Sequence, residues 1–324
     1  MEDTELCFPQ IFNSSCRRPK RPYFEVILIY AILSSISLLT ASLNLLLIIS
    51  ISHFRQLHTP TNLLLLSLAV SDFFVGLLMF FQIVLINGCW FLGDIICVIY
   101  QYLAYIITTA SVGTMVLISV DRYVAICYPL HYGTKITQTK VKICVCLCWV
   151  WSTLFQSLNL MENFYEPGKY NSCFGECVII INYISAFADL ILSFIVPITV
   201  IVVLYLRVFV VAVSQIRAMR SHNAILTLQG SVMAKKSEMK AARTLGIVVI
   251  VFLICLCPYF CVTLTGQDTL LNASSAAFVI CLFYFNSCLN PVVYALFYPW
   301  FRKSIKLIVT LHILHQGSCD TSML

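Results

Sequence analysis

Long apolar runs, separated by short polar connections, dominate the hydrophobic pattern of the chain. A helix that crosses about 30 Å of hydrocarbon needs about 20 mostly apolar residues, because each residue adds about 1.5 Å. Seven stretches meet this length. The pattern therefore predicts seven transmembrane helices, over residues 24–52, 62–86, 97–128, 141–160, 178–213, 244–264 and 273–298.

The composition agrees with the hydrophobic pattern. Of the 324 residues, 60% are hydrophobic and only 10% are charged, which excludes an ordinary soluble domain. Residues 1–22 are polar, contain Cys7 and Cys16, and lack the apolar core of a cleavable signal peptide. We therefore expect an all-α membrane protein whose first span directs its own insertion.

Basic residues indicate the orientation of the spans, since cytoplasmic loops of membrane proteins are enriched in Lys and Arg. Fifteen of the 20 Lys and Arg residues fall on one side of the predicted spans, which we expect to be cytoplasmic, whereas a smaller cluster at residues 17–21 opposes this orientation. The predicted organisation is an extracellular N-terminus (1–23), a seven-transmembrane domain (24–298), and a short amphipathic eighth helix with a cytoplasmic tail (299–324). The alternating apolar and basic residues of 299–309 are typical of a helix that contacts membrane lipid.

Sequons and cysteines support the same orientation. The sequons at Asn13 and Asn272 both fall on the predicted outer side, where N-glycosylation takes place. Disulfides persist only in an oxidising compartment, so the outer cysteines are the candidates for bridges: Cys7, Cys16, Cys89, Cys97, Cys173 and Cys177. The other ten cysteines are interpreted as small hydrophobic residues.

One carboxylate, Asp189, lies within the otherwise apolar stretch 178–206. An acid near the middle of a membrane helix costs about 2.5 to 3.5 kcal/mol on insertion scales, and such residues usually serve a function. The hypothesis is that Asp189 binds a cation. The alternative is a hydrogen-bonded acid that only joins helices, with Asn182 or Ser185 as its partner.

Motifs on separate spans carry a family resemblance. Asp121-Arg122-Tyr123 ends the third predicted span, and Asn290-Pro291-Val292-Val293-Tyr294 ends the seventh. With these motifs the chain resembles the rhodopsin-like, class A G-protein-coupled receptors, which implies a seven-transmembrane helix bundle. The resemblance extends, in the right order, to Asn44, residues 68–72, Trp149, Pro197, Tyr205 and Pro258.

A narrower resemblance concerns the end of the seventh span. Residues 286–301 fill every fixed position of the fingerprint of the trace amine-associated receptors. Two positions depart from the wider family pattern: Leu43 replaces the glycine before Asn44, and Leu256 replaces the tryptophan before Pro258. The second departure implies a different activation trigger.

The resemblance also bears on the ligand, because Ala104 stands where aminergic receptors carry the acid of span three. Asp189, eight residues before Pro197, matches the acid that a branch of the family expanded in fish carries on span five. The resemblance implies an amine bound in a turned-around pose, with its ammonium group at span five instead of span three. A charge-assisted hydrogen bond and cation–π contacts would hold it there. The residues expected to line this site with Asp189 are Tyr105, Thr108, Tyr259, Phe260, Thr263, Ile280 and Tyr284.

Two disulfides and an ion site are implied in the same way. Cys97 is expected to pair with Cys177, and Cys16 with Cys173, with Cys7 as the rival of Cys16 in the second bridge. The residues that match the family's sodium site are Asp72, Ser111, Asn286 and Asn290. Their oxygen atoms suit a hard cation, and the alternative is a polar network without an ion. No other cofactor is expected.

Charged and aromatic residues near the cytoplasmic side match the family's activation switch. The resemblance implies that Glu238 latches span six to Arg122, and that a ligand favours an outward swing of span six which opens a crevice for a G protein. The residues expected to take part in this switch are Asp121, Arg122, Tyr123, Tyr205, Glu238, Asn290, Pro291 and Tyr294.

These features predict a receptor rather than an enzyme or a transporter. All six histidines lie near the predicted cytoplasmic face, so no nucleophile and base come together, and no inverted repeat is detectable. We expect an olfactory trace amine-associated receptor that binds an amine and signals through a stimulatory or olfactory G protein to cyclic AMP. We expect it in the plasma membrane of olfactory cilia and without a nucleic-acid partner. The alternative is a class A receptor for a non-amine ligand, in which Asp189 is structural.

Overall fold

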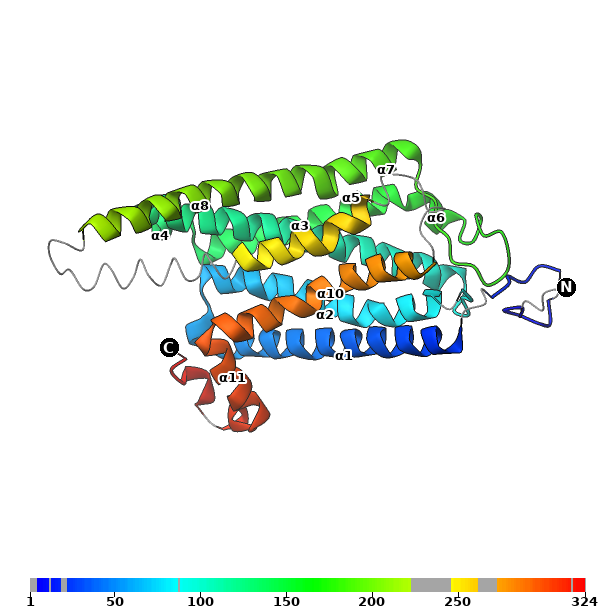
Figure 1. Cartoon of the computed structure of the whole chain (residues 1–324), viewed down its shortest axis with the longest axis horizontal. Coiled ribbons are helices and arrows are strands. Elements are labelled where there is room, and N and C mark those ends of the chain that lie inside the picture. The colour runs from blue at the N-terminus through cyan, green and yellow to red at the C-terminus, as the bar shows by residue number, and fades with distance from the viewer. Residues whose placement is uncertain are drawn as a thin grey trace.

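The computed structural model describes residues 5–11, 13–18, 22–86, 88–222, 246–261, 273–315 and 317–323. Within these ranges long helices lie side by side in one elongated bundle (Figure 1). In the described part of the chain, six helices are long and apolar enough to cross a membrane, and a shorter apolar helix covers Gly246–Cys261. The predicted fold, an all-α bundle of membrane-spanning helices, is confirmed.

The long helices are joined by short connections that contain small helical turns. The long helices are α1 (Tyr23–His53), α2 (Pro60–Ile86), α3 (Asp94–Cys127), α5 (Gln138–Asn159), α8 (Val196–His222) and α10 (Ala273–Phe297). α7 (Tyr183–Asp189) joins α8 through a π-helical turn, η3 (Leu190–Ile195), so these three elements form one span. The smaller elements are η1 (Arg55–Leu57), η2 (Pro129–His131), α4 (Tyr132–Lys135), α6 (Met161–Tyr165), α11 (Pro299–Val309), η4 (His312–Leu314) and η5 (Ser318–Asp320).

The predicted spans agree with the observed helices except at some ends. The fifth span was expected from residue 178, but its helix begins at Tyr183. The reason is a cap: the Asn182 side chain accepts a hydrogen bond of 2.8 Å from the backbone N–H of Ser185, which starts the helix there. The sixth predicted span, 244–264, is described over Gly246–Cys261, and its flanks lie outside the described residues.

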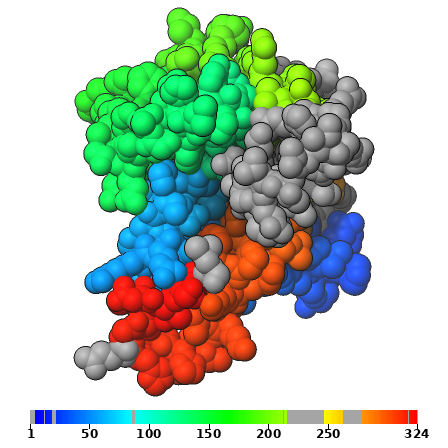
Figure 2. Space-filling view, turned by 90° about the vertical axis from the view of Figure 1, so that its left-hand side faces the viewer, coloured from blue at the N-terminus to red at the C-terminus, as the bar shows by residue number. Residues whose placement is uncertain are grey.

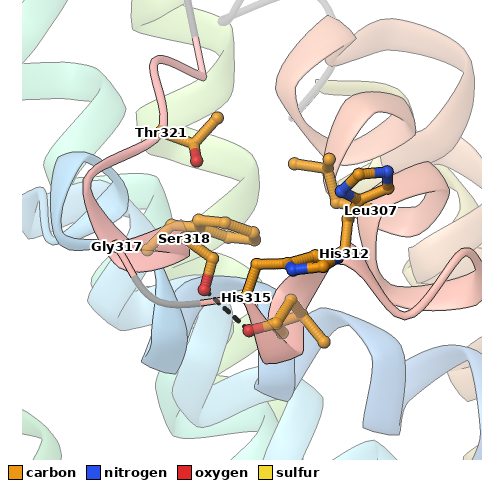
Figure 3. Close-up of a pocket in the computed structure, with 8 residues that line it drawn as sticks. Leu307, His312, His315, Gly317, Ser318 and Thr321 are labelled. Atoms are coloured by element: carbon orange, nitrogen blue, oxygen red, sulfur yellow. Dashed lines mark hydrogen bonds between the residues drawn. The ribbon is translucent and has the colours of Figure 1, made fainter.

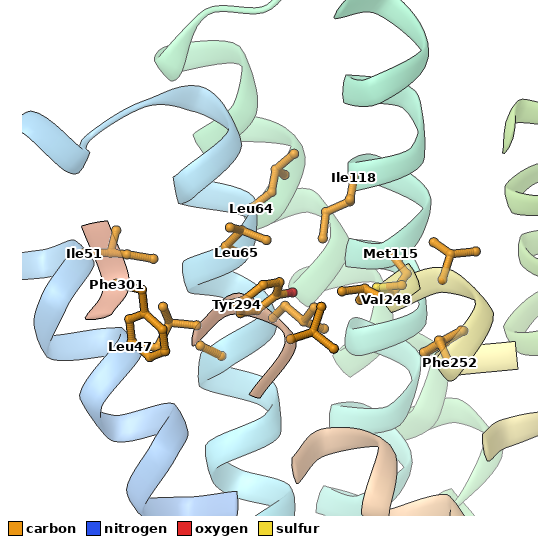
Figure 4. Packing of buried hydrophobic residues seen from close by; sticks show 14 of the residues in the cluster. Leu47, Ile51, Leu64, Leu65, Met115, Ile118, Val248, Phe252, Tyr294 and Phe301 are labelled. Atoms are coloured by element: carbon orange, nitrogen blue, oxygen red, sulfur yellow. The ribbon is translucent and has the colours of Figure 1, made fainter. Parts of the chain in front are cut away.

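A large apolar core holds the helices together at the end of the bundle where α11 lies, here called the α11 end. Figure 4 shows side chains from neighbouring helices converging in this core. They include Leu47 and Ile51 of α1, Leu64 and Leu65 of α2, Met115 and Ile118 of α3, Val248 and Phe252 of the helix Gly246–Cys261, Tyr294 of α10 and Phe301 of α11. Leu256, which replaces the family tryptophan, is also buried in this core.

Helices α1 and α2 approach each other closely at Gly76. A Cβ atom at this position would lie only 2.8 Å from the backbone nitrogen of Ala41. The Ser37 hydroxyl donates a hydrogen bond of 2.7 Å to the Gly76 carbonyl across the same contact. Glycine is therefore required here by the backbone of the neighbouring helix rather than by its own dihedral angles.

The opposite end, here called the disulfide end, carries three bridges, two from the N-terminal segment to loops and one from α3 to a loop. Cys97 pairs with Cys177, Cys16 with Cys173, and Cys7 with Cys89. The first two are the pairs that the family resemblance implied, whereas the third was missed. Backbone hydrogen bonds reinforce the assembly, among them Phe174 N–H to Ser14 O at 2.6 Å and Trp90 N–H to Gly175 O at 2.7 Å.

The first sequon and the C-terminal segment lie outside the membrane helices, at opposite ends of the bundle. Asn13 of the first sequon is exposed at the disulfide end, and Asn272 of the second lies outside the described residues. At the α11 end, the C-terminal segment packs against the turn after α1 (Figure 2). Asp320 forms an ion pair of 3.4 Å with Arg55, and the Met323 N–H donates to Gln56 Oε1 at 3.0 Å.

Candidate functional site

Asp189 is the last residue of α7 and is half-buried within the bundle. Its Oδ1 atom accepts two hydrogen bonds, from Gln156 Nε2 of α5 at 2.8 Å and from the Ser193 hydroxyl at 2.9 Å. The partners proposed from the sequence, Asn182 and Ser185, are wrong, because these two residues form the helix cap at the start of α7. The Asp189 carboxylate therefore connects α5 to η3, the π-helical turn that follows α7.

Asp189 and Ser193 are four residues apart, a spacing that places both on one helix face, and Ser193 lies within the π-helical turn. Pro197 has no N–H and cannot donate to the helix, so the hydrogen-bond ladder must change in the preceding turn. There the Val196 N–H donates to the Ile191 carbonyl, five residues back, as in a π-helix. Such single π turns occur frequently at functional sites.

Aromatic rings form a continuous row next to the span that carries Asp189. Phe194 stacks on Phe260 with ring centroids 4.0 Å apart, and Phe260 contacts Tyr259 at 5.5 Å. Tyr259 contacts Phe283 at 4.9 Å, and Phe283 contacts Tyr284 at 5.4 Å. The row thus runs from η3 across the helix Gly246–Cys261 to α10.

Tyr105 lies on α3 one turn before Thr109, whose hydroxyl is bonded to the same Gln156 side chain as Asp189. The structure thus brings the predicted residues Tyr259, Phe260 and Tyr284 into one row, and Gln156 links Asp189 to the helix that carries Tyr105. Thr263, also predicted, lies outside the described residues. Two members of the row, Phe194 and Phe283, were missed although each lies within five positions of a predicted residue.

Three polar side chains, Gln82, Tyr100 and Tyr284, lie together at the α10 end of the row. The Tyr100 hydroxyl donates to Gln82 Oε1 at 2.7 Å, and the Tyr284 hydroxyl lies 3.4 Å from the same oxygen. Ile280 packs against the apolar cluster that contains Tyr284. Thr108 uses its hydroxyl to donate to the Ala104 carbonyl at 2.8 Å, so its hydrogen is already engaged within α3.

A second candidate site surrounds Asp72 of α2, which is fully buried. Its Oδ2 atom accepts a hydrogen bond of 2.8 Å from Asn290 Nδ2 of α10. Among the described residues, Oδ1 of Asp72, Oδ1 of Asn286 and Oδ1 of Asn290 are buried without a hydrogen-bond partner. Ser111 of α3 is buried too. Buried oxygens that lack donors are the ligands that a hard cation needs, so these residues fit a sodium ion.

Asp121 and Arg122 form a buried ion pair at the α11 end of α3. Two residues that were missed complete this group. The Thr61 hydroxyl of α2 lies 3.0 Å from Asp121 Oδ2 and accepts from the Arg122 guanidinium at 2.6 Å. The Tyr132 hydroxyl of α4 donates to Asp121 Oδ1 at 2.8 Å. Burial, followed by the nearby Asp121 charge, raises the pKa of Tyr132 to about 12, so it remains a donor.

The remaining predicted switch residues lie on several described helices, except for one outside the described residues. The hydroxyls of Tyr205 and Tyr294 are buried without a hydrogen-bond partner among the described residues. Tyr123 contacts the ring of Tyr128 at 5.8 Å, and Pro291 lies inside α10. Glu238, the expected latch on span six, lies outside the described residues.

A small cavity of about 270 Å³ lies at the α11 end, away from both candidate sites. Figure 3 shows His312 and His315 on one side of it and Gly317, Ser318 and Thr321 on the other. The Ser318 hydroxyl donates to the Ile313 carbonyl at 2.6 Å and lies 3.0 Å from His53 Nε2. The Ser318 hydroxyl thus stabilises the fold of the C-terminal segment.

Comparisons with known proteins agree with the architecture and motifs. The family model described as "7 transmembrane receptor (rhodopsin family)" matches residues 43–294. The chain is 36% identical to trace amine-associated receptor 13c of Danio rerio, over 99% of this chain and 97% of the relative. It is 35% identical to trace amine-associated receptor 4 of Mus musculus, over 99% and 96%, and 36% identical to trace amine-associated receptor 1 of Mus musculus, over 91% and 92%.

Proposed function

The chain belongs to the rhodopsin family of seven-transmembrane receptors and within it to the trace amine-associated receptors, and on this premise we propose that Asp189 binds the ammonium group of an amine ligand. Members of this family are receptors rather than enzymes, need no cofactor, take a small-molecule ligand, and act on a heterotrimeric G protein. The multi-pass membrane location follows from the same family and from the apolar helices.

The observation that carries the proposal is the position of Asp189 beside the aromatic row. Phe194, five residues after Asp189 in the same span, stacks on Phe260, and Tyr259 follows in the row. An ammonium group at this carboxylate gains a charge-assisted hydrogen bond, and a ring face within about 6 Å adds about 0.5 to 2 kcal/mol. Ala104 offers no charge on α3, so a ligand held by Asp189 lies in the turned-around pose.

Signal transfer in this proposal runs through the Asp121–Arg122 pair. Thr61 and Tyr132 hold Asp121, and Glu238 is the proposed latch from span six to Arg122. Ligand binding favours a state in which these charges are released to a stimulatory or olfactory G protein, which raises cyclic AMP. In this proposal Tyr123, Tyr205, Asn290, Pro291 and Tyr294 rearrange with the switch.

The sodium ion and the cellular location complete the proposal. Asp72, Ser111, Asn286 and Asn290 would hold an allosteric sodium ion, for which the unpaired buried oxygens are the support. The disulfide end would face the extracellular side, in the plasma membrane of olfactory cilia, with glycans on Asn13 and Asn272. α11 would lie on the inner lipid surface through its basic residues.

A second function is favoured by one specific observation. Gln156 and Ser193 already satisfy Asp189 Oδ1, as they would in an acid that only joins helices. The protein would then be a class A receptor for a non-amine ligand, in which Asp189 is structural.

Replacement of Asp189 by Ala separates the two functions. Loss of a hydrogen bond to a charged group costs about 1.5 to 3 kcal/mol, so we expect the half-maximal concentration of primary, tertiary and di-amines to rise about tenfold to a hundredfold. The measurement is cyclic AMP in cells with matched surface levels of receptor. Asp94→Ala, which removes an exposed acid at the disulfide end, is the control. An undiminished amine response of Asp189→Ala would support the structural role.

A further inference from the structure

Gln156 is a polar side chain that the proposed ligand contacts do not use. It lies on α5, inside an apolar membrane helix, and is fully buried with an exposed fraction of 0%. A buried amide costs free energy unless its donors and acceptors are engaged. Its three hydrogen bonds therefore show what the site requires of it.

The direction of these hydrogen bonds fixes the orientation of the amide. The Thr109 hydroxyl donates to the Tyr105 carbonyl at 2.9 Å, so its oxygen can only accept from Gln156, whose Nε2 lies 3.0 Å away. Gln156 Oε1 accepts from Asn159 Nδ2 at 3.3 Å on the other side. If the amide were rotated by 180°, Gln156 Oε1 would face the Thr109 oxygen and Asp189 Oδ1. Neither of these atoms could donate a hydrogen bond to it.

The consequence for Asp189 is that its two oxygens differ. Oδ1 accepts from Gln156 Nε2 and from the Ser193 hydroxyl, which engages both of its lone pairs. No hydrogen bond from the part of the chain that the structure describes reaches Oδ2. The carboxylate is thus held by one oxygen, and the other is left for a ligand.

We propose that Gln156 is a positioning residue that orients the Asp189 carboxylate and leaves Oδ2 as its single acceptor for the ligand. This inference rests on the proposed amine-binding role of Asp189. An ammonium group held across both oxygens would have to displace Gln156 or Ser193. An ammonium group held at Oδ2 needs one N–H, which a tertiary amine supplies as well as a primary amine does. Gln156 therefore sets the tolerance of the site for tertiary amines.

The test compares a primary amine with its N,N-dimethyl derivative on the full-length receptor. Gln156→Leu keeps the side-chain size but removes the donor and frees a lone pair on Oδ1. We expect both amines to lose about tenfold in potency, because the carboxylate is less well oriented. We also expect the tertiary amine to lose about threefold more than the primary amine, because only the primary amine has a second N–H for the freed oxygen.

Two further variants keep the test decisive. Thr109→Val removes the partner that fixes the amide but leaves Gln156 in place, so it should change the potency ratio in the same direction by a smaller factor. If Gln156→Leu does not reach the cell surface, the potency ratio of Thr109→Val tests the positioning role instead. Ser157→Ala is the control, because this neighbour on α5 bonds to Tyr102 and not to Asp189, and it should leave the ratio unchanged.

The outcomes separate this inference from its premise. A changed ratio in Gln156→Leu or in a surface-expressed Thr109→Val supports the positioning role. An unchanged ratio, with equal losses for both amines, shows a merely structural glutamine and overturns the inference. Asp189→Asn, assayed in parallel, tests the premise: if it keeps full amine potency the proposed function fails, and if it loses potency while the ratio stays constant only the inference fails.

Discussion

At the scale of single residues, the chemistry depends on two acids within the bundle, the fully buried Asp72 and the half-buried Asp189. Asp189 is bonded through one oxygen, and Asp72 also has one bonded and one free oxygen. A buried carboxylate oxygen without a donor is costly, and Oδ1 of Asp72 is such an atom among the described residues. In the proposed function each acid gains a partner, a sodium ion at Asp72 and an ammonium group at Asp189.

Removal of the carboxylate at Asp72 should abolish sensitivity to sodium. The ion would connect α2, α3 and α10, and a ligand that moves these helices must act against it, so sodium should lower agonist affinity in the parent receptor. We expect replacement of sodium by N-methylglucamine to raise agonist affinity severalfold in the parent and not in Asp72→Asn. Radioligand competition measures this. Equal sodium dependence of Asp72→Asn and the parent would contradict the site.

The sequence identifies these acids but not their partners. Asp189 is visible as the only charge in a long apolar stretch, and Asp72 as part of a family segment. The pairing of Asp189 with Gln156 joins residues 33 positions apart on different spans. Hydrophobic periodicity carries no information on such a pairing. The partners expected from the sequence, Asn182 and Ser185, precede Asp189, whereas the bonded Ser193 follows it by four residues.

At the scale of helices, apolar length predicts the elements well and their ends less well. The start of the fifth span was wrong by five residues, since Asn182 caps the helix at Tyr183 although residues 178–181 are as apolar as the span itself. Hydrophobicity determines which segments enter the membrane, but local hydrogen bonds determine where a helix begins. The hydrophobic pattern of the sequence likewise did not predict contacts between helices, such as the one at Gly76.

Substitution of Gly76 by Ala should destabilise the contact between α1 and α2. The added Cβ atom would lie 2.8 Å from a backbone nitrogen, which cannot move without a shift of the whole helix. We expect a loss of about 1 to 3 kcal/mol, seen as a lower melting temperature of the purified receptor in detergent. Gly133→Ala is the matched control, because a Cβ atom there meets no atom within 4 Å. Equal melting temperatures of the two variants would refute the close contact.

At the scale of the whole molecule, the two ends of the bundle are built differently. The disulfide end is fixed by covalent bonds from the N-terminal segment to two loops, whereas the α11 end is held by the Asp121–Arg122 group and an apolar core. The third bridge, Cys7–Cys89, was missed because sequence cannot give disulfide connectivity. The even number of six outer cysteines, with two pairs assigned, was the signal that could have suggested it.

Loss of the Cys7–Cys89 bridge should weaken the whole disulfide end. It joins residues 82 positions apart, and removal of a native disulfide typically costs about 2 to 5 kcal/mol. We expect Cys7→Ser and Cys89→Ser each to reduce surface expression and melting temperature by similar amounts, and the double variant to be no worse than either. Cys144→Ser, which removes an exposed free cysteine, is the control. Additive losses in the double variant would show that the two cysteines act separately.

Asp189 is proposed to recognise the charge of the ligand, and a comparison of charged with neutral ligands measures this recognition. Competition binding would compare an amine with the alcohol of the same shape on the parent and on Asp189→Asn, in which the side chain keeps its size and loses its charge. We expect the parent to prefer the amine and Asp189→Asn to lose about tenfold or more of this preference. An equal preference for the amine in both receptors would contradict it.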